Sequence, residues 1–144
     1  MTDDLKSIAS EIDKKIRLHN WFDFHVLKYD CNTLSIAGGT DLTYYHTLEL
    51  VFEDVFFVSG FFQGWHTNTS KPAFWLEDDK LMNEKYEINQ GCRLFIFEAE
   101  DYINRIIVAA KKISFNSDIV YYYDRPDLKD NERIADFVKK KNAL

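Results

Sequence analysis

The clearest hydrophobic pattern of the chain lies in residues 41–62, which read DLTYYHTLELVFEDVFFVSGFF. From Leu42 to Phe52 apolar residues recur at every second position, which is typical of a half-buried strand. Glu53-Asp54 interrupts the apolar run, and Val55 to Phe62 resumes it. The pattern predicts two long strands that meet at a tight acidic turn, as the central hairpin of an antiparallel sheet. One very long strand with a bulge at the acidic pair is the alternative interpretation.

Helices are expected at both ends of the chain. Leu5, Ile8, Ile12 and Ile16 fall at helical spacing within residues 3–18, so one narrow apolar stripe faces the sheet. A second helix is expected over residues 130–142, with its own short apolar stripe. The remaining strands are expected at 21–30, 33–37, 72–76, 92–99, 103–115 and 119–123.

Two of these strand assignments carry an alternative or a qualification, and two further segments are expected to lie outside the sheet. A helix over Tyr102–Lys112 competes with the strand at 103–115, and the density of β-branched residues favours the strand. Pro72 cannot donate a ladder hydrogen bond, which puts the strand at 72–76 at an edge of the sheet. Residues 63–71 are expected to be a loop, and residues 77–91 a loop with a helical turn.

The pattern as a whole predicts a single α+β domain over residues 1–144. We expect an N-terminal helix, a strongly curved antiparallel β-meander of about seven to eight strands and a C-terminal helix. Two short helices cannot cover so many strands, so we expect the sheet to fold onto itself as a half-barrel or sandwich. Formation of a homodimer is also expected, because so much aromatic surface needs cover.

Composition adds a preference for sheet and limits the classes of partner. Aromatic residues make up 16% of the chain, and such side chains favour pleated surfaces. The net charge is −6 and no basic stripe is visible, which argues against nucleic acid and anionic membranes as partners. A basic protein partner is compatible with this charge, although the same charge also simply keeps a sheet-rich domain in solution.

The cysteines and the first residues predict a cytoplasmic location. The N-terminal stretch MTDDLKSIASEIDKK is charged and has no apolar core, so we expect no signal peptide. Cys31 and Cys92 are then expected to be free thiols. They have neither C-x-x-C spacing nor an adjacent base, so neither a zinc site nor a catalytic thiol is expected. No apolar run approaches the ~20 residues of a membrane span.

The sequence holds no recognised catalytic or phosphate-binding motif, and no cofactor is expected. His25 and His46 lie on strands of neighbouring hairpins, where with Glu49 or Asp23 they would form an acid–base pair or part of a metal site. His46 shares its parity with core residues, which favours a hydrogen-bonded core histidine instead.

Carboxylates and aromatics form the remaining candidate surface for a partner or ligand. If the acidic pairs at 53–54 and 100–101 share one end of the sheet, they build an acidic rim for a basic partner. Large aromatics near the 63–71 loop would anchor an interface or line a pocket, although plugging of the core is the competing interpretation. The candidate surface residues are Glu53, Asp54, Trp65, His66, Trp75, Glu100 and Asp101.

A resemblance to a known class of proteins spans residues 21–115. The segments Trp21–Val26, Leu50–Val55 and Phe95–Glu98, with the strand at 103–113 behind them, are similar to small bacterial α+β domains. Among these are immunity proteins of polymorphic toxin systems. In such families a Phe-His-Asp segment commonly opens the first strand, whereas this chain has Phe24-His25-Val26. The resemblance implies a non-enzymatic cytosolic protein that binds another protein, and no binding residue is carried over.

Three hypotheses about function follow. The leading one is a non-enzymatic, cytosolic protein-binding domain of bacterial type, an immunity-like partner of a basic toxin. The alternative is a small-molecule or lipid-binding domain with an aromatic-lined cavity in the curved sheet. The third is a hydrolase-like enzyme built on His25, His46 and Glu49, which requires these side chains to converge in an open cleft.

Overall fold

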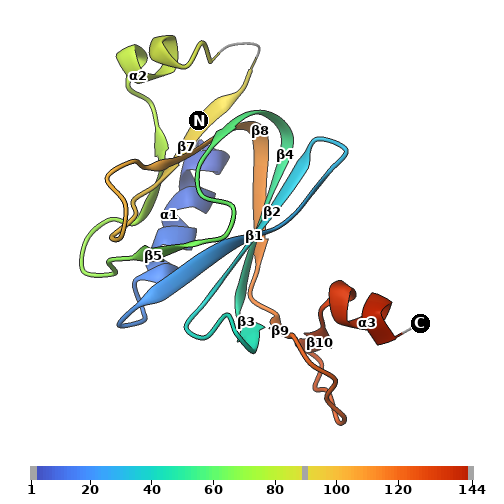
Figure 1. Cartoon of the computed structure of the whole chain (residues 1–144). Coiled ribbons are helices and arrows are strands. Elements are labelled where there is room, and N and C mark those ends of the chain that lie inside the picture. The colour runs from blue at the N-terminus through green and yellow to red at the C-terminus, as the bar shows by residue number, and fades with distance from the viewer. Residues whose placement is uncertain (1–2, 89–90, 143–144) are drawn as a thin grey trace.

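A seven-stranded antiparallel sheet curls around the first helix and forms a half-barrel (Figure 1). The computed structural model describes residues 3–88 and 91–142, with side chains described as far as residue 139. Its elements are α1 (Asp4–Ile16), β1 (Phe22–Asp30), β2 (Thr33–Gly39), β3 (Tyr45–His46), β4 (Leu48–Ser59), β5 (Trp65–Thr67), β6 (Phe74–Glu77), α2 (Lys80–Lys85), β7 (Arg93–Phe97), β8 (Ile106–Asn116), β9 (Ile119–Tyr121), β10 (Glu132–Ile134) and α3 (Asp136–Asn142). The predicted α+β class, with terminal helices and a curved antiparallel sheet, is confirmed.

The strand order of the large sheet is β5-β1-β2-β4-β8-β7-β6, and a small second sheet has the order β10-β9-β3. All pairs in the large sheet are antiparallel, but β5 pairs with β1 and not with its neighbour in sequence, β4. The edge position predicted for the strand at 72–76 is confirmed, because β6 ends the sheet. The loop predicted at 63–71 is wrong at its centre, where three residues form the other edge strand, β5.

Helix α1 fills the concave side of the half-barrel, as Figure 1 shows. It begins after Asp3, whose carboxylate accepts a hydrogen bond from the backbone N–H of Lys6 at 3.3 Å, a standard N-cap. Ala9, Ile12 and Ile16 are at most 1% exposed and form the stripe that faces the sheet. The apolar spacing therefore predicted both the helix and the face that it buries.

Aromatic rings form the centre of the core beside α1. Phe52 lies edge-on to Phe95 at a centroid distance of 5.5 Å, and Phe74 lies 4.6 Å from Phe97. All four rings are at most 1% exposed. These rings occupy the interior in which the ligand-binding alternative would place its cavity.

Strand β4 shows that the predicted acidic hairpin is wrong and that the bulge interpretation is right. The strand runs without a turn from Leu48 to Ser59, and both halves pair with the same partner, β8. The register shifts between Val55 and Phe57, and Asp54 has a positive φ of 54°. The long β8 offers a continuous partner on both sides of the acidic pair, so the chain bends there without reversing.

The C-terminal part also differs from the prediction. The expected helix at 130–142 begins only at Asp136, because residues 132–134 form β10 and pair in parallel with β9. The expected strand over 42–52 begins late: residues 42–44 form a turn and Tyr45–His46 forms the short β3 of the second sheet. Local periodicity cannot reveal these three-residue and two-residue strands, which exist only through their pairing with β9.

The remaining assignments agree with the structure. Residues 106–116 form a strand and not the competing helix. Within the segment 77–91 the expected helical turn is α2, while residues 89–90 lie outside the described residues. Cys31 and Asn32 close the β1–β2 hairpin with positive φ angles of 49° and 67°, as a two-residue hairpin turn requires. Cys31 is exposed, Cys92 is partly buried, and both are free thiols.

Candidate functional site

An open groove with a volume of about 610 Å³ lies beside the start of β1. It is bounded by β1, the turn after β2, the segment that enters β5, and the segment that follows β7. Its chemically distinctive lining residues are Asp23, Asp41, Trp65, His66, Asp101 and Tyr102. None of the described residues that line it is a lysine or an arginine, so the groove is acidic and aromatic.

His66 lines this groove and pairs with Asp23. The two residues face each other across β5 and β1, and the His66 Nδ1 atom contacts an oxygen of the Asp23 carboxylate. The His66 side chain is 65% exposed, whereas that of Asp23 is 25% exposed. The bond to Asp23 raises the pKa of His66, and the nearby charges of Asp101 and Glu100 add to this effect.

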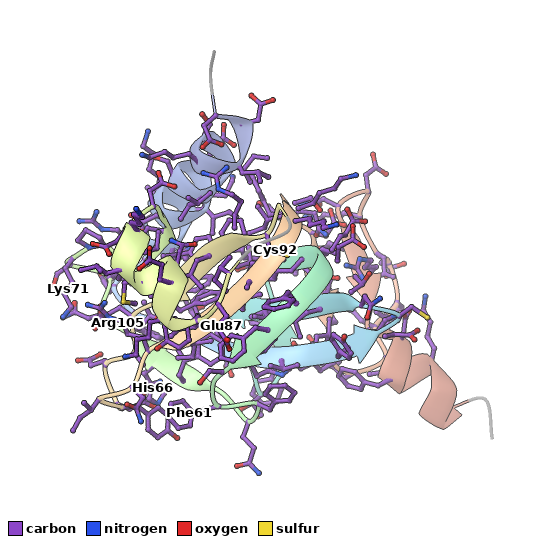
Figure 2. All side chains as sticks on the ribbon, turned by 90° about the horizontal axis from the view of Figure 1, so that it is seen from above. Phe61, His66, Lys71, Glu87, Cys92 and Arg105 are labelled. Atoms are coloured by element: carbon purple, nitrogen blue, oxygen red, sulfur yellow. The ribbon has the colours of Figure 1, made fainter. Side chains whose placement is uncertain are left out.

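Tyr102 supplies an aromatic ring to the lining of the groove, and Phe61 stacks against this ring. Tyr102 lies on Phe61 at a centroid distance of 3.7 Å and an interplanar angle of 14°. Figure 2 shows Phe61 and His66 on the same side of the molecule. Trp65, by contrast, is only 3% exposed and stacks on Phe24 within the core, so its ring mainly plugs the end of the sheet.

The edges of the large sheet are occupied by other parts of the chain. At β5 the His66 N–H donates to the Asp101 carboxylate at 3.1 Å, and the Glu100 N–H donates to the His66 carbonyl at 2.8 Å. At β6 one oxygen of Asp13, in α1, accepts from the N–H groups of Ala73 and Phe74 at 2.8 and 3.0 Å. Both edges are therefore blunted against the addition of a strand from another chain.

A second cluster of polar side chains lies on the outer face of β1, β2 and β4. Its centre is the hydroxyl group of Tyr122, which lies 2.8 Å from His25 Nε2 and 2.7 Å from His46 Nδ1. His46 Nε2 lies 3.0 Å from the Glu49 carboxylate, which also binds Arg133. We call this chain of five residues the Tyr122 network.

The hydrogen-bond partners assign the protons in the Tyr122 network. Glu49 accepts from His46 Nε2–H, so His46 Nδ1 is the acceptor for the Tyr122 hydroxyl proton. The Tyr122 oxygen in turn accepts from His25 Nε2–H. Each of these hydrogen bonds thus joins one donor to one acceptor.

The charges in the Tyr122 network follow from burial and from these partners. The hydrogen bond from His46, together with the charge of Arg133, lowers the pKa of Glu49. Burial, with the neighbouring His46, lowers the pKa of His25, and burial strongly raises the pKa of Tyr122. At neutral pH the network therefore contains ionised Glu49, neutral His25 and a protonated Tyr122 hydroxyl.

The two predicted histidines thus converge with Glu49, although not as the enzyme hypothesis required. His46 is 0% exposed, and His25 alone of the three residues contributes to the open groove. The predicted pairing of His25 with Asp23 does not form, because Asp23 binds His66. No sequence pattern pointed to Tyr122 and Arg133, which reach the site only through the small second sheet.

The expected acidic rim is wrong as a geometric prediction. Glu53 pairs with Lys112, six residues along β8 from the end that adjoins Asp101. At about 3.3 Å per residue this separation is roughly 20 Å. Asp54 lies at the bend of β4, near the β1–β2 turn, so the two acidic pairs do not share an end of the sheet.

The candidate surface residues consequently fall into separate places. Trp65, His66 and Asp101 meet at the groove, with Glu100 beside them. Trp75 lies elsewhere, with its Nε1 atom bonded to Glu77 at 3.2 Å and the Arg105 guanidinium over its ring at 5.2 Å.

Comparison with known proteins adds no constraint on function. No family model matches the chain, and neither a curated protein nor a solved structure matches it. Within residues 3–88 and 91–142, no helix has the length and apolar character needed to cross a membrane. No group of three or more His, Cys, Asp or Glu residues in those ranges is arranged to hold a metal ion.

Proposed function

We propose that this chain is a non-enzymatic protein-binding domain that holds a basic, extended segment of its partner in the groove beside β1. The observation that carries the proposal is the lining of the groove, which combines three carboxylates with an aromatic wall. Its volume of about 610 Å³ suits several side chains at once and lies in the usual range for binding sites.

Asp41 is the carboxylate best placed to meet a cation from the partner. It is exposed in the turn after β2, where its backbone carbonyl accepts from the N–H groups of Tyr44 and Tyr45 at 3.1 Å. Among the described residues no side chain pairs with its carboxylate. A lysine or arginine of the partner therefore meets a charge that no other group neutralises.

The Tyr102 ring in the groove lining supports the same choice of partner. An arginine guanidinium lies favourably over an aromatic face, at about 0.5–1 kcal/mol for an exposed site. Tyr102 lines the groove together with Asp101, so one side chain can contact a ring and a carboxylate there. Basic, extended segments rich in arginine match this combination better than neutral ones do.

The properties of the whole chain agree with a basic partner. A net charge of −6 accelerates the encounter with a positively charged protein and disfavours nucleic acid. The blunted sheet edges favour binding through side chains over addition of a strand. A basic toxin, the partner in the immunity-like hypothesis, is one partner of this class.

The test compares an arginine peptide with its neutral isostere. We expect acetyl-tetra-arginine amide to bind in isothermal titration at low ionic strength, and the tetra-citrulline peptide to bind much more weakly. Asp41→Lys should weaken arginine binding about fivefold, as expected when one exposed charge is reversed. Glu53→Lys makes the same change in net charge in the middle of β4, outside the groove lining, and should leave the affinity within about twofold.

Two results would overturn the proposal. One is equal binding of the arginine and citrulline peptides, which would remove charge from the recognition. The other is an equal loss of affinity in Asp41→Lys and Glu53→Lys, which would mean that net charge attracts the peptide and the groove does not bind it. Homodimerisation remains a separate prediction, to be checked by native mass spectrometry.

A further inference from the structure

We propose that His66 competes with the partner's cationic side chain for Asp23, so that a basic segment binds fully only after the imidazole has lost its proton. This inference rests on the proposed function, since it concerns the regulation of the same groove. It assigns His66 the role of an internal, pH-dependent competitor.

Asp23 and His66 both line the groove, and the imidazole occupies one oxygen of the Asp23 carboxylate. Asp23 lies on β1 with its side chain three-quarters buried, and the imidazole on the neighbouring β5 contacts its carboxylate. The imidazole itself is 65% exposed. A guanidinium that binds Asp23 from the groove therefore competes with the imidazole for the same carboxylate.

The groups around His66 are almost all acidic. Asp23 faces it from β1, Asp101 and Glu100 approach from the segment after β7, and Asp41 lines the same groove from the turn after β2. His25, on the same face of β1, also lines the groove, but burial and the proximity of His46 lower its pKa. Within the described lining, His66 is therefore the one group that carries a positive charge near neutral pH.

Protonation of His66 changes the groove by one charge. The imidazolium neutralises Asp23 and repels an incoming cation, whereas the neutral imidazole restores the full negative charge of the carboxylates. Because the hydrogen bond to Asp23 and the nearby charges of Asp101 and Glu100 raise the pKa of His66, this change falls above the usual 6.5. Affinity for a basic segment should thus rise as pH rises, and a bound segment should in turn lower the pKa of His66.

The experiment measures the affinity of acetyl-tetra-arginine amide for the full chain between about pH 5.5 and 8.5, at constant ionic strength. Arginine does not titrate in this range, so any change in affinity belongs to the protein. We expect the affinity of the natural chain to rise about fivefold with pH, the effect of one exposed charge pair. In His66→Gln the affinity should be high at all pH values, because the amide can still bind Asp23 without carrying charge.

His19→Gln is the matched control. His19 is exposed at the end of α1 and its ring stacks on Phe22 at 5.1 Å, outside the groove. Its replacement removes another titrating imidazole and should leave the pH profile unchanged. A second measurement needs no variant: NMR titration of the His66 ring with and without peptide should show a lower pKa in the complex.

The outcomes separate this inference from the proposed function. If the arginine peptide binds with an affinity independent of pH, or if the pKa of His66 is the same with and without peptide, the competition is refuted while the binding function stands. If His66→Gln keeps the pH dependence of the natural chain, the inference fails as well. If no arginine peptide binds at any pH to either chain, the proposed function itself is refuted.

Discussion

Replacement of Tyr122 by phenylalanine removes the one oxygen atom that His25 and His46 share. The ring is retained, so its edge-on contact with Phe137 at 5.0 Å should persist. The variant leaves His46 Nδ1 without its donor, and His46 is 0% exposed. It also leaves His25 Nε2–H without its acceptor.

The cost follows from these two lost hydrogen bonds. A typical intramolecular hydrogen bond contributes about 0.5–1.5 kcal/mol, and a buried group left without a partner costs about 1–3 kcal/mol. We therefore expect Tyr122→Phe to lower the free energy of unfolding by about 2–3 kcal/mol. For a chain of this size that loss corresponds to a fall of roughly 5–10 °C in the melting temperature.

Urea denaturation followed by circular dichroism measures this change, and Tyr123→Phe provides the neighbouring control. The Tyr123 hydroxyl accepts from Arg125 at 3.1 Å in an exposed position, so its removal should cost less than about 0.5 kcal/mol. Hydrogen exchange should show the loss of protection in Tyr122→Phe concentrated in β9 and β10. Equal stability of the two variants would refute the idea that the Tyr122 network anchors the C-terminal strands.

Two further predictions concern His25 in the Tyr122 network and Asp13 at the β6 edge. The pKa of His25 is lower in the folded than in the unfolded chain, so the unfolded chain binds a proton first and the free energy of unfolding should fall as the pH drops below about 6.5. His25→Gln should flatten this fall. An unchanged slope of unfolding free energy against pH, measured by urea titrations, would contradict the reasoning. His66 acts in the opposite sense, because its raised pKa stabilises the folded chain at lower pH. The effect of His66 is present in both chains, so the difference in unfolding free energy between the natural chain and His25→Gln at each pH isolates the contribution of His25. Asp13→Ala should cost about 1–3 kcal/mol and promote aggregation in light scattering, because it uncovers the β6 edge, whereas the exposed Glu11→Ala on the same helix should do neither.

The sequence predicted what depends on local periodicity. The stripe from Leu5 to Ile16 indicated α1 and its buried face, and the alternation before Phe52 indicated a half-buried strand. It could not decide whether the chain turns or bends at Glu53-Asp54, because that depends on the partner strand. Strand β4 pairs with β8 on both sides of the acidic pair, so the chain bends there and does not turn.

The candidate sites show the same limit at the level of side chains. Parity placed His46 correctly among buried residues, and the structure adds Glu49 three residues later as its partner. The other partners, Tyr122 and Arg133, lie 76 and 84 residues further along the chain from the groups that they bind. Such pairs arise from tertiary packing, and no spacing rule within a single sequence can reveal them.

The segments that pack on the outer face of the sheet explain where the groove lies. On the outer face of β7 and β8, Leu94, Ile96 and Ile107 are covered by Met82 and Tyr86, from α2 and the residue that follows it. On the outer face of β1, β2 and β4, the cover comes from the C-terminal strands through the Tyr122 network, at the far end of the molecule from α2 (Figure 1).

Between these two covers, the start of β1 and the short β5 present their outward side chains to solvent. Side chains alternate between the two faces of a strand, and Phe22 and Phe24 point into the core. Asp23, which lies between them, and its cross-strand partner His66 therefore point outward. Polar side chains were therefore required at this uncovered position, and the fold gathers them beside the acidic turn at Asp41. The groove is thus a part of the outer sheet face that the chain leaves uncovered, which supports the proposed placement of a partner there.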